Sequence, residues 1–314
     1  MPETTSIARH RFAVLTAVAT YVLLFLGGLV TSTGSGLAVP DWPLSFGQVF
    51  PAMVGGVLFE HGHRLAASTV GLLTLVLSIW TVVSDTRPGV RVLAILMLVA
   101  VALQGILGGV TVLYKLPLAV SVTHACLAQV FFCLAVTMAV VTGPAWTLAP
   151  ARPLDLGQPV VRLAASTTLV VFVQLLLGAL VRHTGAGLAI PDFPLAFGRL
   201  VPPLDTPLIA IHFVHRIGAA IVATLVLTLA GVMVLHHGTD RRLVRLVGLA
   251  TTLLLVQISL GASIVWTHRA VVPTTTHLVV GAALLATSVV ITLRAARAVP
   301  RPHPAPELDH AVPA

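Results

Sequence analysis

The chain has 314 residues, of which 57% are apolar and 9% are charged, and its mean hydropathy is +1.02. These values exclude a soluble globular protein and indicate an integral membrane protein. The formal net charge is +8, but the basic residues flank apolar runs and form no basic patch, so no nucleic acid is expected as a partner.

Eight apolar runs are each about the length that crosses a bilayer as a helix. They cover residues 12–31, 64–84, 92–113, 121–142, 161–181, 209–235, 244–266 and 275–293. Twelve of the eighteen Lys and Arg residues lie at the chain ends or in the even-numbered connections, which predicts that both termini are cytoplasmic. The sequence therefore predicts an all-α integral membrane protein with eight transmembrane helices.

The chain contains an internal repeat. Residues 33–47 reappear almost unchanged as residues 184–198, at an offset of 151. Such a duplication divides the chain into two four-helix halves, 1–150 and 151–314, the second with a cytoplasmic tail. Because each half holds an even number of spans, a pseudo-two-fold axis along the membrane normal is expected to relate them. The long external connections, 32–60 and 182–209, are rich in Pro and Gly; they are either structural caps or lids over two sites.

Four histidines occupy matching places in the two halves: His63, His124, His215 and His277. Each falls near the external end of an even-numbered span, where an ionisable group is costly and usually functional. Two imidazoles facing each other in each half predict two bis-histidine haem sites. Hydrogen-bonded packing histidines are the alternative, and zinc is disfavoured because no third ligand accompanies them. Three further histidines are expected at the membrane interface: His61, His183 and His268.

One difference between the halves bears on chemistry. Glu60 precedes His63 by one helical turn, whereas His212 holds the equivalent place before His215. A carboxylate beside a haem can take a proton or stabilise positive charge, so the first half is predicted to transform a haem and the second to hold one. A surface glutamate favoured by the helix dipole is the alternative.

Other residues near the histidines are candidate site-lining groups. Arg64 and Arg216 directly follow two of the histidines and are expected either to pair with haem propionates or to reach the headgroups. A Gln-x-x-x-Gly motif serves either helix packing or site lining. It occurs at Gln104/Gly108, Gln174/Gly178 and Gln257/Gly261, of which Gln104 and Gln257 are the predicted lining residues.

With these motifs the chain resembles the haem A synthase family over about residues 10–295. The resemblance implies an eight-helix bundle that oxidises the C8 methyl of haem O to a formyl group by successive oxidations, giving haem A for aa3-type terminal oxidases. It implies that His63 and His124 bracket the substrate haem and that Glu60 is the catalytic carboxylate. It also implies that His215 and His277 ligate a resident haem b.

The resemblance further implies a multi-pass protein of a bacterial cell membrane, with the haem sites near the outer face. Expected partners are a membrane electron acceptor such as a quinone, the farnesyltransferase that makes haem O, and further copies of the chain. Many family members carry a cysteine pair in the first external connection, where this chain has Val39 and Ser45. Its two cysteines, Cys126 and Cys133, lie two turns apart in one span, so no disulfide is expected. A di-haem electron carrier and a haem transporter or chaperone are the rival functions.

Overall fold

The structure, a computed structural model, describes residues 7–147, 157–238 and 240–298. Within these ranges the chain forms eight long helices and no β-strand. The long helices are α1 (Ile7–Ser32), α2 (Gly56–Ser84), α3 (Pro88–Leu113), α4 (Leu118–Thr142), α6 (Gly157–His183), α7 (Pro207–His237), α8 (Arg241–Trp266) and α9 (Val271–Ala298). Two short elements are α5 (Pro144–Thr147) and the 3-10 turn η1 (Ala186–Leu188).

All eight predicted spans are confirmed, because each long helix is apolar and long enough to cross a membrane. The largest boundary difference is in α2, which begins at Gly56, eight residues before the apolar run at 64. Glu60 and His63 therefore both lie inside this helix. The chain is a multi-pass all-α membrane protein.

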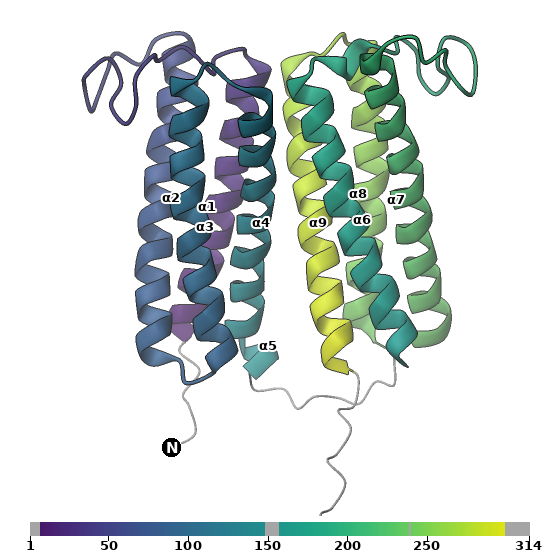
Figure 1. Cartoon of the computed structure of the whole chain (residues 1–314). Coiled ribbons are helices and arrows are strands. Elements are labelled where there is room, and N and C mark those ends of the chain that lie inside the picture. The colour runs from purple at the N-terminus through teal and green to yellow at the C-terminus, as the bar shows by residue number, and fades with distance from the viewer. Residues whose placement is uncertain (1–6, 148–156, 239, 299–314) are drawn as a thin grey trace, which may run out of the picture.

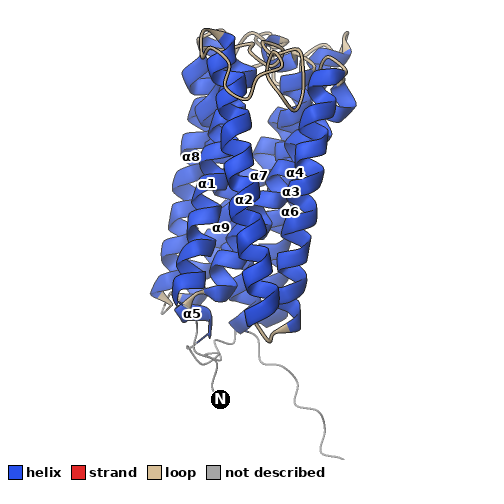
Figure 2. Cartoon of the chain, turned by 90° about the vertical axis from the view of Figure 1, so that its left-hand side faces the viewer, coloured by secondary structure: helices blue, strands red, loops and turns tan. Residues whose placement is uncertain are grey.

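The helices gather in two groups of four, α1–α4 and α6–α9, whose long connections 33–55 and 184–206 lie at the same end of the molecule (Figures 1 and 2). Buried apolar side chains form two separate clusters, one containing Leu77 and Met97, the other Met233 and Leu285. The predicted boundary between the halves, at 150 and 151, lies outside the described residues, as do the first six residues and the tail 299–314.

The starts of two helices follow from local sequence. Thr206 accepts a hydrogen bond from the Ile209 N–H at 3.3 Å, and Pro207 follows it at the first position of α7, where its fixed φ suits a helix. Asp240 caps α8 by accepting from the backbone N–H groups of Arg242 and Leu243 at 2.8 and 3.1 Å. These caps fix where the helices of the second group begin.

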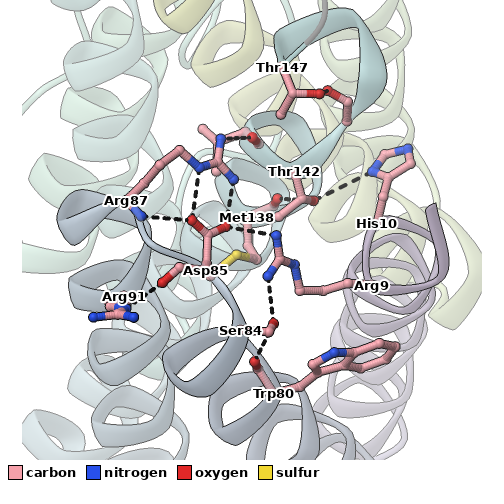
Figure 3. A network of polar contacts seen from close by, with 12 residues as sticks. Arg9, His10, Trp80, Ser84, Asp85, Arg87, Arg91, Met138, Thr142 and Thr147 are labelled. Atoms are coloured by element: carbon pink, nitrogen blue, oxygen red, sulfur yellow. Dashed lines mark hydrogen bonds and ion pairs between the residues drawn. The ribbon is translucent and has the colours of Figure 1, made fainter. Parts of the chain in front are cut away.

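A buried ion cluster closes the first group at the end opposite the long connections (Figure 3). The Asp85 carboxylate, 1% exposed, pairs with Arg9 at 2.8 Å and with Arg87 at 2.7 Å. Arg9 also donates to Ser84 Oγ at 2.7 Å, and Arg87 donates to the Val141 carbonyl at 2.9 Å. The cluster thus ties α1, the α2–α3 connection and α4 together.

Arg182, in the last turn of α6, joins the two groups. Its guanidinium donates to the Gly28 carbonyl at 3.3 Å and to Ser32 Oγ at 3.3 Å, both on α1. It also donates to the Thr274 carbonyl on α9 at 3.0 Å. One side chain therefore fixes α6 against α1 and α9 at the end that carries the long connections.

Candidate functional site

The four repeat-equivalent histidines lie on α2, α4, α7 and α9, each within about two turns of the start of its helix. Each imidazole lies against a glycine of a neighbouring helix. A Cβ at that glycine would stand only 3.0 to 3.4 Å from the ring Cε1, in the pairs Gly27–His63, Gly108–His124, Gly178–His215 and Gly261–His277. The four glycines therefore make the space that the four rings occupy.

The rings are paired within each half. His63 and His124 are close enough to interact electrostatically, and so are His215 and His277. Among the described residues, no three His, Cys, Asp or Glu side chains come together in a way that could hold a metal ion. Two imidazoles per half are the donor set of bis-histidine haem coordination.

Three glutamines flank three of the four histidines. Gln174 Nε2 donates to the His215 carbonyl at 2.8 Å and lies 3.0 Å from its Nδ1. Gln104 Nε2 donates to the His124 carbonyl at 3.0 Å and lies 3.4 Å from its Nε2. At the third position, the Gln257 backbone carbonyl lies 3.1 Å from His277 Nδ1.

The fourth position breaks this pattern. At the repeat offset of 151, the counterpart of Gln174 is Leu23, one turn before Gly27. His63 therefore has a leucine where the other three histidines have a glutamine. Gln174 was not among the predicted lining residues. Its amide nitrogen lies 3.0 Å from a histidine ring nitrogen, compared with 3.4 Å for the predicted Gln104. Its own Gln-x-x-x-Gly motif was the available signal.

Several buried polar atoms around the rings have no hydrogen-bond partner among the described residues. They are Nδ1 of two histidines and Oε1 of three glutamines: His63, His124, Gln104, Gln174 and Gln257. Buried polar atoms in native proteins nearly always have partners, so three such atoms in the first half and two in the second indicate that further groups complete both places. The two imidazoles of each half, set against small glycines, fit a bound haem.

Glu60 is 4% exposed and anchors the first long connection. Its Oε2 accepts from the Val39 N–H at 2.9 Å, and its Oε1 pairs with Arg64 at 2.7 Å. Arg64 also donates to the Asp41 and Leu44 carbonyls at 2.7 and 2.8 Å. The alternative of a surface glutamate is therefore wrong, and Arg64 is held by the connection rather than extended towards headgroups.

His212 makes the corresponding contacts in the second half. The Ile190 N–H lies 3.3 Å from His212 Nδ1, and Arg216 Nε lies 3.3 Å from His212 Nε2; a neutral imidazole accepts a hydrogen bond at only one of these two nitrogens. Arg216 also donates to the Asp192 and Leu195 carbonyls at 2.7 and 2.8 Å. An acid and an imidazole thus anchor the two connections in the same way.

His61 was expected at the membrane interface, and it contacts the first connection. Its side chain is buried, and its Nδ1 lies 2.8 Å from Ser45 Oγ in the first connection. His183 is the last residue of α6, and His268 is exposed in the α8–α9 connection. Val39 and Ser45, which stand near the expected cysteine positions, thus attach the connection to α2 by hydrogen bonds, and both cysteines of the chain are free.

The connections are also ordered from within. Asp41 accepts from the backbone N–H groups of Gly47 and Phe46 at 2.8 and 2.7 Å, and Asp192 accepts from those of Gly198 and Phe197 at the same distances. These hydrogen bonds hold the pKa of each carboxyl below its ordinary value, and the bond from the glycine N–H has the largest effect in each case. Both connections are thus closed turns that cover the end where the histidines lie.

Comparison with known proteins identifies similar chains. Residues 53–289 match the family described as Cytochrome oxidase assembly protein. A protein of Shouchella clausii named Heme A synthase is 31% identical over 268 residues, which cover 83% of this chain and 87% of that one. Proteins of the same name from Symbiobacterium thermophilum and Halalkalibacterium halodurans are 36% identical (68% and 71% of the two chains) and 31% identical (82% and 86%).

Proposed function

Since this chain belongs to the family of cytochrome oxidase assembly proteins, we propose that it is a haem A synthase, a membrane oxidoreductase acting on haem O. The reaction oxidises the C8 methyl of the porphyrin to a formyl group in successive steps, and the product serves aa3-type terminal oxidases. The proposal depends on one observation. Each half holds two histidines, and Glu60 accompanies the two in the first half, whereas His212 accompanies the two in the second.

In this proposal the two pairs have different tasks. His63 and His124 receive the substrate haem O in the half formed by α1–α4. His215 and His277 hold a resident haem b in the half formed by α6–α9, and this cofactor supplies one-electron redox chemistry when bound. The Gln174 amide lies 3.0 Å from His215 Nδ1; with its oxygen towards the ring it accepts the Nδ1–H, fixes the ring and leaves Nε2 free for the iron.

Glu60 is the proposed catalytic carboxylate. It lies one helical turn before His63, and its two oxygens are fixed by the Val39 N–H and by Arg64. A carboxylate held in this way can accept a proton from the oxidised carbon centre or stabilise positive charge on the ring. His212, with the same anchoring contacts, leaves the second half without an acidic group at this place.

The remaining parts of the proposal concern the membrane setting. The arginine bias supports a cytoplasmic location for the two ends of the chain, with the histidines near the outer face of a bacterial cell membrane. Electrons pass to an acceptor in the membrane, of which a quinone is the candidate. The farnesyltransferase that makes haem O and further copies of the chain are proposed partners.

The test is haem extraction and chromatography from membranes that contain haem O and this protein. Three variants separate carboxylate chemistry from anchoring of the connection. Glu60→Ala removes both, Glu60→Gln keeps an acceptor for the Val39 N–H, and Glu60→His installs the side chain that anchors the second connection. The native chain should yield haem A, and all three variants should yield at least about a hundredfold less while retaining haem b, as expected for loss of a general acid–base group.

Two results would contradict the proposal. If the Glu60→His and Glu60→Gln variants make haem A at the native rate, Glu60 serves only to anchor the connection. If the native chain retains haem b and leaves haem O unchanged even with a competent electron acceptor, the di-haem electron carrier replaces the synthase.

A further inference from the structure

A cavity of about 600 Å³ lies between α1, α4 and α9, at the end of the bundle that carries α5 (Figure 1). None of the four histidines of the proposed haem sites lines it, and the function proposed above does not use it. Most of its wall consists of Val and Ala side chains, including Val14, Val18, Val136, Val140 and Ala283. Its polar lining is concentrated at the α5 end, where His10, Trp146 and Arg294 lie.

The cavity has the length of one membrane leaflet. Its lining extends from His10 to Tyr21 on α1, from Phe132 to Gly143 on α4 and from Ala283 to Arg294 on α9, eleven residues in each case. At a rise of 1.5 Å per residue this is about 16 Å. Half of the hydrocarbon core of a bilayer is about 15 Å thick. An acyl chain of a single leaflet therefore matches the cavity in length.

The inner end of the cavity suits an apolar tail rather than a polar head. The rings of Tyr21 and Phe132 stack there with their centroids 5.6 Å apart. The Tyr21 hydroxyl donates to the Val279 carbonyl at 3.1 Å, so its hydrogen is already used. A quinone ring needs donors for its carbonyl oxygens, and this end offers little for that purpose.

The mouth of the cavity carries an excess of positive charge. Arg294 Nε is buried and has no hydrogen-bond partner among the described residues. Arg242 and Arg297 are close enough to Arg294 to repel it. Asp240, whose Oδ1 caps α8, offsets part of this charge, and none of the described lining residues is acidic. An anion would stabilise this partly exposed guanidinium, whose Nε has no hydrogen-bond partner among the described residues.

We propose that this cavity binds an anionic phospholipid from the leaflet on the α5 side, with its phosphate at Arg294 and one acyl chain between α1, α4 and α9. Arginine forms bidentate bonds with phosphate oxygens, and basic pockets between transmembrane helices bind acidic headgroups. Trp146 lies under the Arg297 guanidinium, 4.7 Å from it, at the level where indole rings meet headgroups. The lipid would fill the seam between the two helix groups.

Native mass spectrometry of the full-length protein in nanodiscs tests this proposal. The discs contain equal amounts of phosphatidylglycerol and phosphatidylcholine, and detergent then removes loosely held lipid. We expect one phosphatidylglycerol to remain on the native chain and Arg294→Gln to lower its occupancy by roughly fivefold. Ala286→Phe and Val136→Phe fill the cavity from α9 and α4. Both should lower the occupancy of phosphatidylglycerol although Arg294 is unchanged. Arg241→Gln, an exposed arginine at the same end, is the control and should retain the lipid.

Each other outcome overturns the proposal. Equal retention of phosphatidylcholine, which is zwitterionic but also has a phosphate, would refute the selectivity for an anionic lipid. Retention of phosphatidylglycerol in both cavity-filling variants, with native melting temperatures, would place the lipid elsewhere. A quinone that copurifies from host membranes and is displaced by Val136→Phe would identify the cavity as a quinone site.

Discussion

Glu60 and His212 make the same two contacts, although one side chain is an acid and the other an imidazole. Each lies next to the backbone N–H of the residue before the repeated proline of its connection, and each contacts the arginine four residues on. The duplicated fold therefore keeps its anchoring while one half gains a carboxylate beside a histidine. This arrangement separates stability of the connection from chemistry at the ring, which is why single exchanges at position 60 are informative.

The close packing of His63 on Gly27 and of His215 on Gly178 predicts half-specific defects. A valine at either glycine would displace the ring, because even a Cβ stands 3.0 or 3.3 Å from Cε1. Gly178→Val should lose most of the resident haem, as measured by pyridine haemochrome. Gly27→Val should keep that haem and lose haem A formation. Gly71→Val, where nothing lies within 4 Å, is the control; identical behaviour of all three variants would refute the packing argument.

Gln174→Leu should weaken haem retention in the second half. The substitution removes the amide at 3.0 Å from His215 Nδ1, and loss of such a supporting contact typically costs about 10–100-fold in metal affinity. Haem transfer to apomyoglobin measures the dissociation rate. Gln158→Leu makes the same change at the exposed opposite end of α6 and should have no effect. Equal rates for the native chain and the Gln174 variant would show that the glutamine serves helix packing alone.

Arg64→Ala should release the first connection. The variant loses the guanidinium bonds to two backbone carbonyls and to Glu60, and hydrogen bonds that involve a charged group contribute about 1.5–3 kcal/mol each. Amide hydrogen exchange across residues 39–48 should rise at least about tenfold. Lys115→Ala, an exposed cation in the α3–α4 connection, should leave exchange unchanged. Unchanged exchange in Arg64→Ala would mean that Asp41 alone holds the turn.

The buried ion pairs of Asp85 predict that the folded protein loses stability in acid. Burial alone would raise the pKa of Asp85, but hydrogen bonds from Arg87 and the charges of Arg87 and Arg9 lower it below its ordinary value. The unfolded chain therefore binds this proton more tightly than the folded chain does. The stabilisation is complete above the ordinary aspartate pKa of about 3.9 and is lost as the pH falls from there towards the folded pKa.

The melting temperature in detergent between pH 7 and pH 3 checks this expectation. Asp85→Ala should lower the stability at pH 7 by about 3–5 kcal/mol, because it leaves Arg9 buried without its carboxylate. Asp85→Asn should be less stable than the native chain at pH 7 and should lose less on acidification. Parallel pH profiles for the native chain and Asp85→Asn would contradict the assignment.

Hydropathy predicted the eight helices because each has to be apolar over about 20 residues to cross a bilayer. It missed the first eight residues of α2 because Glu60, His61 and His63 are polar. These side chains are accommodated in the helix because the connection and the neighbouring helices receive them. A hydropathy average over one segment takes no account of hydrogen-bond partners that lie in another part of the chain.

The histidines were found from the repeat, whereas their surroundings were found only in part. Arg64 and Arg216 look like anion-binding groups in the sequence, because an arginine within a span needs acceptors. Their acceptors include backbone carbonyls, which every residue has and no sequence pattern distinguishes. Gly27 was overlooked because Leu23 interrupts the Gln-x-x-x-Gly motif there. The roles of the histidines, Glu60, Gln104 and Gln257 stay predictions for the variants above.

Arg182 has a consequence for how the two halves can move. Its guanidinium contacts the carbonyl of Gly28, next to the glycine under His63, and the carbonyl of Thr274, three residues before His277. A single rigid, planar group thus spans the backbones that support one histidine from each pair. Rocking of one half against the other would have to break these bonds first. Electrons exchanged between the two sites would therefore cross a gap of constant width, without any domain motion to set their rate.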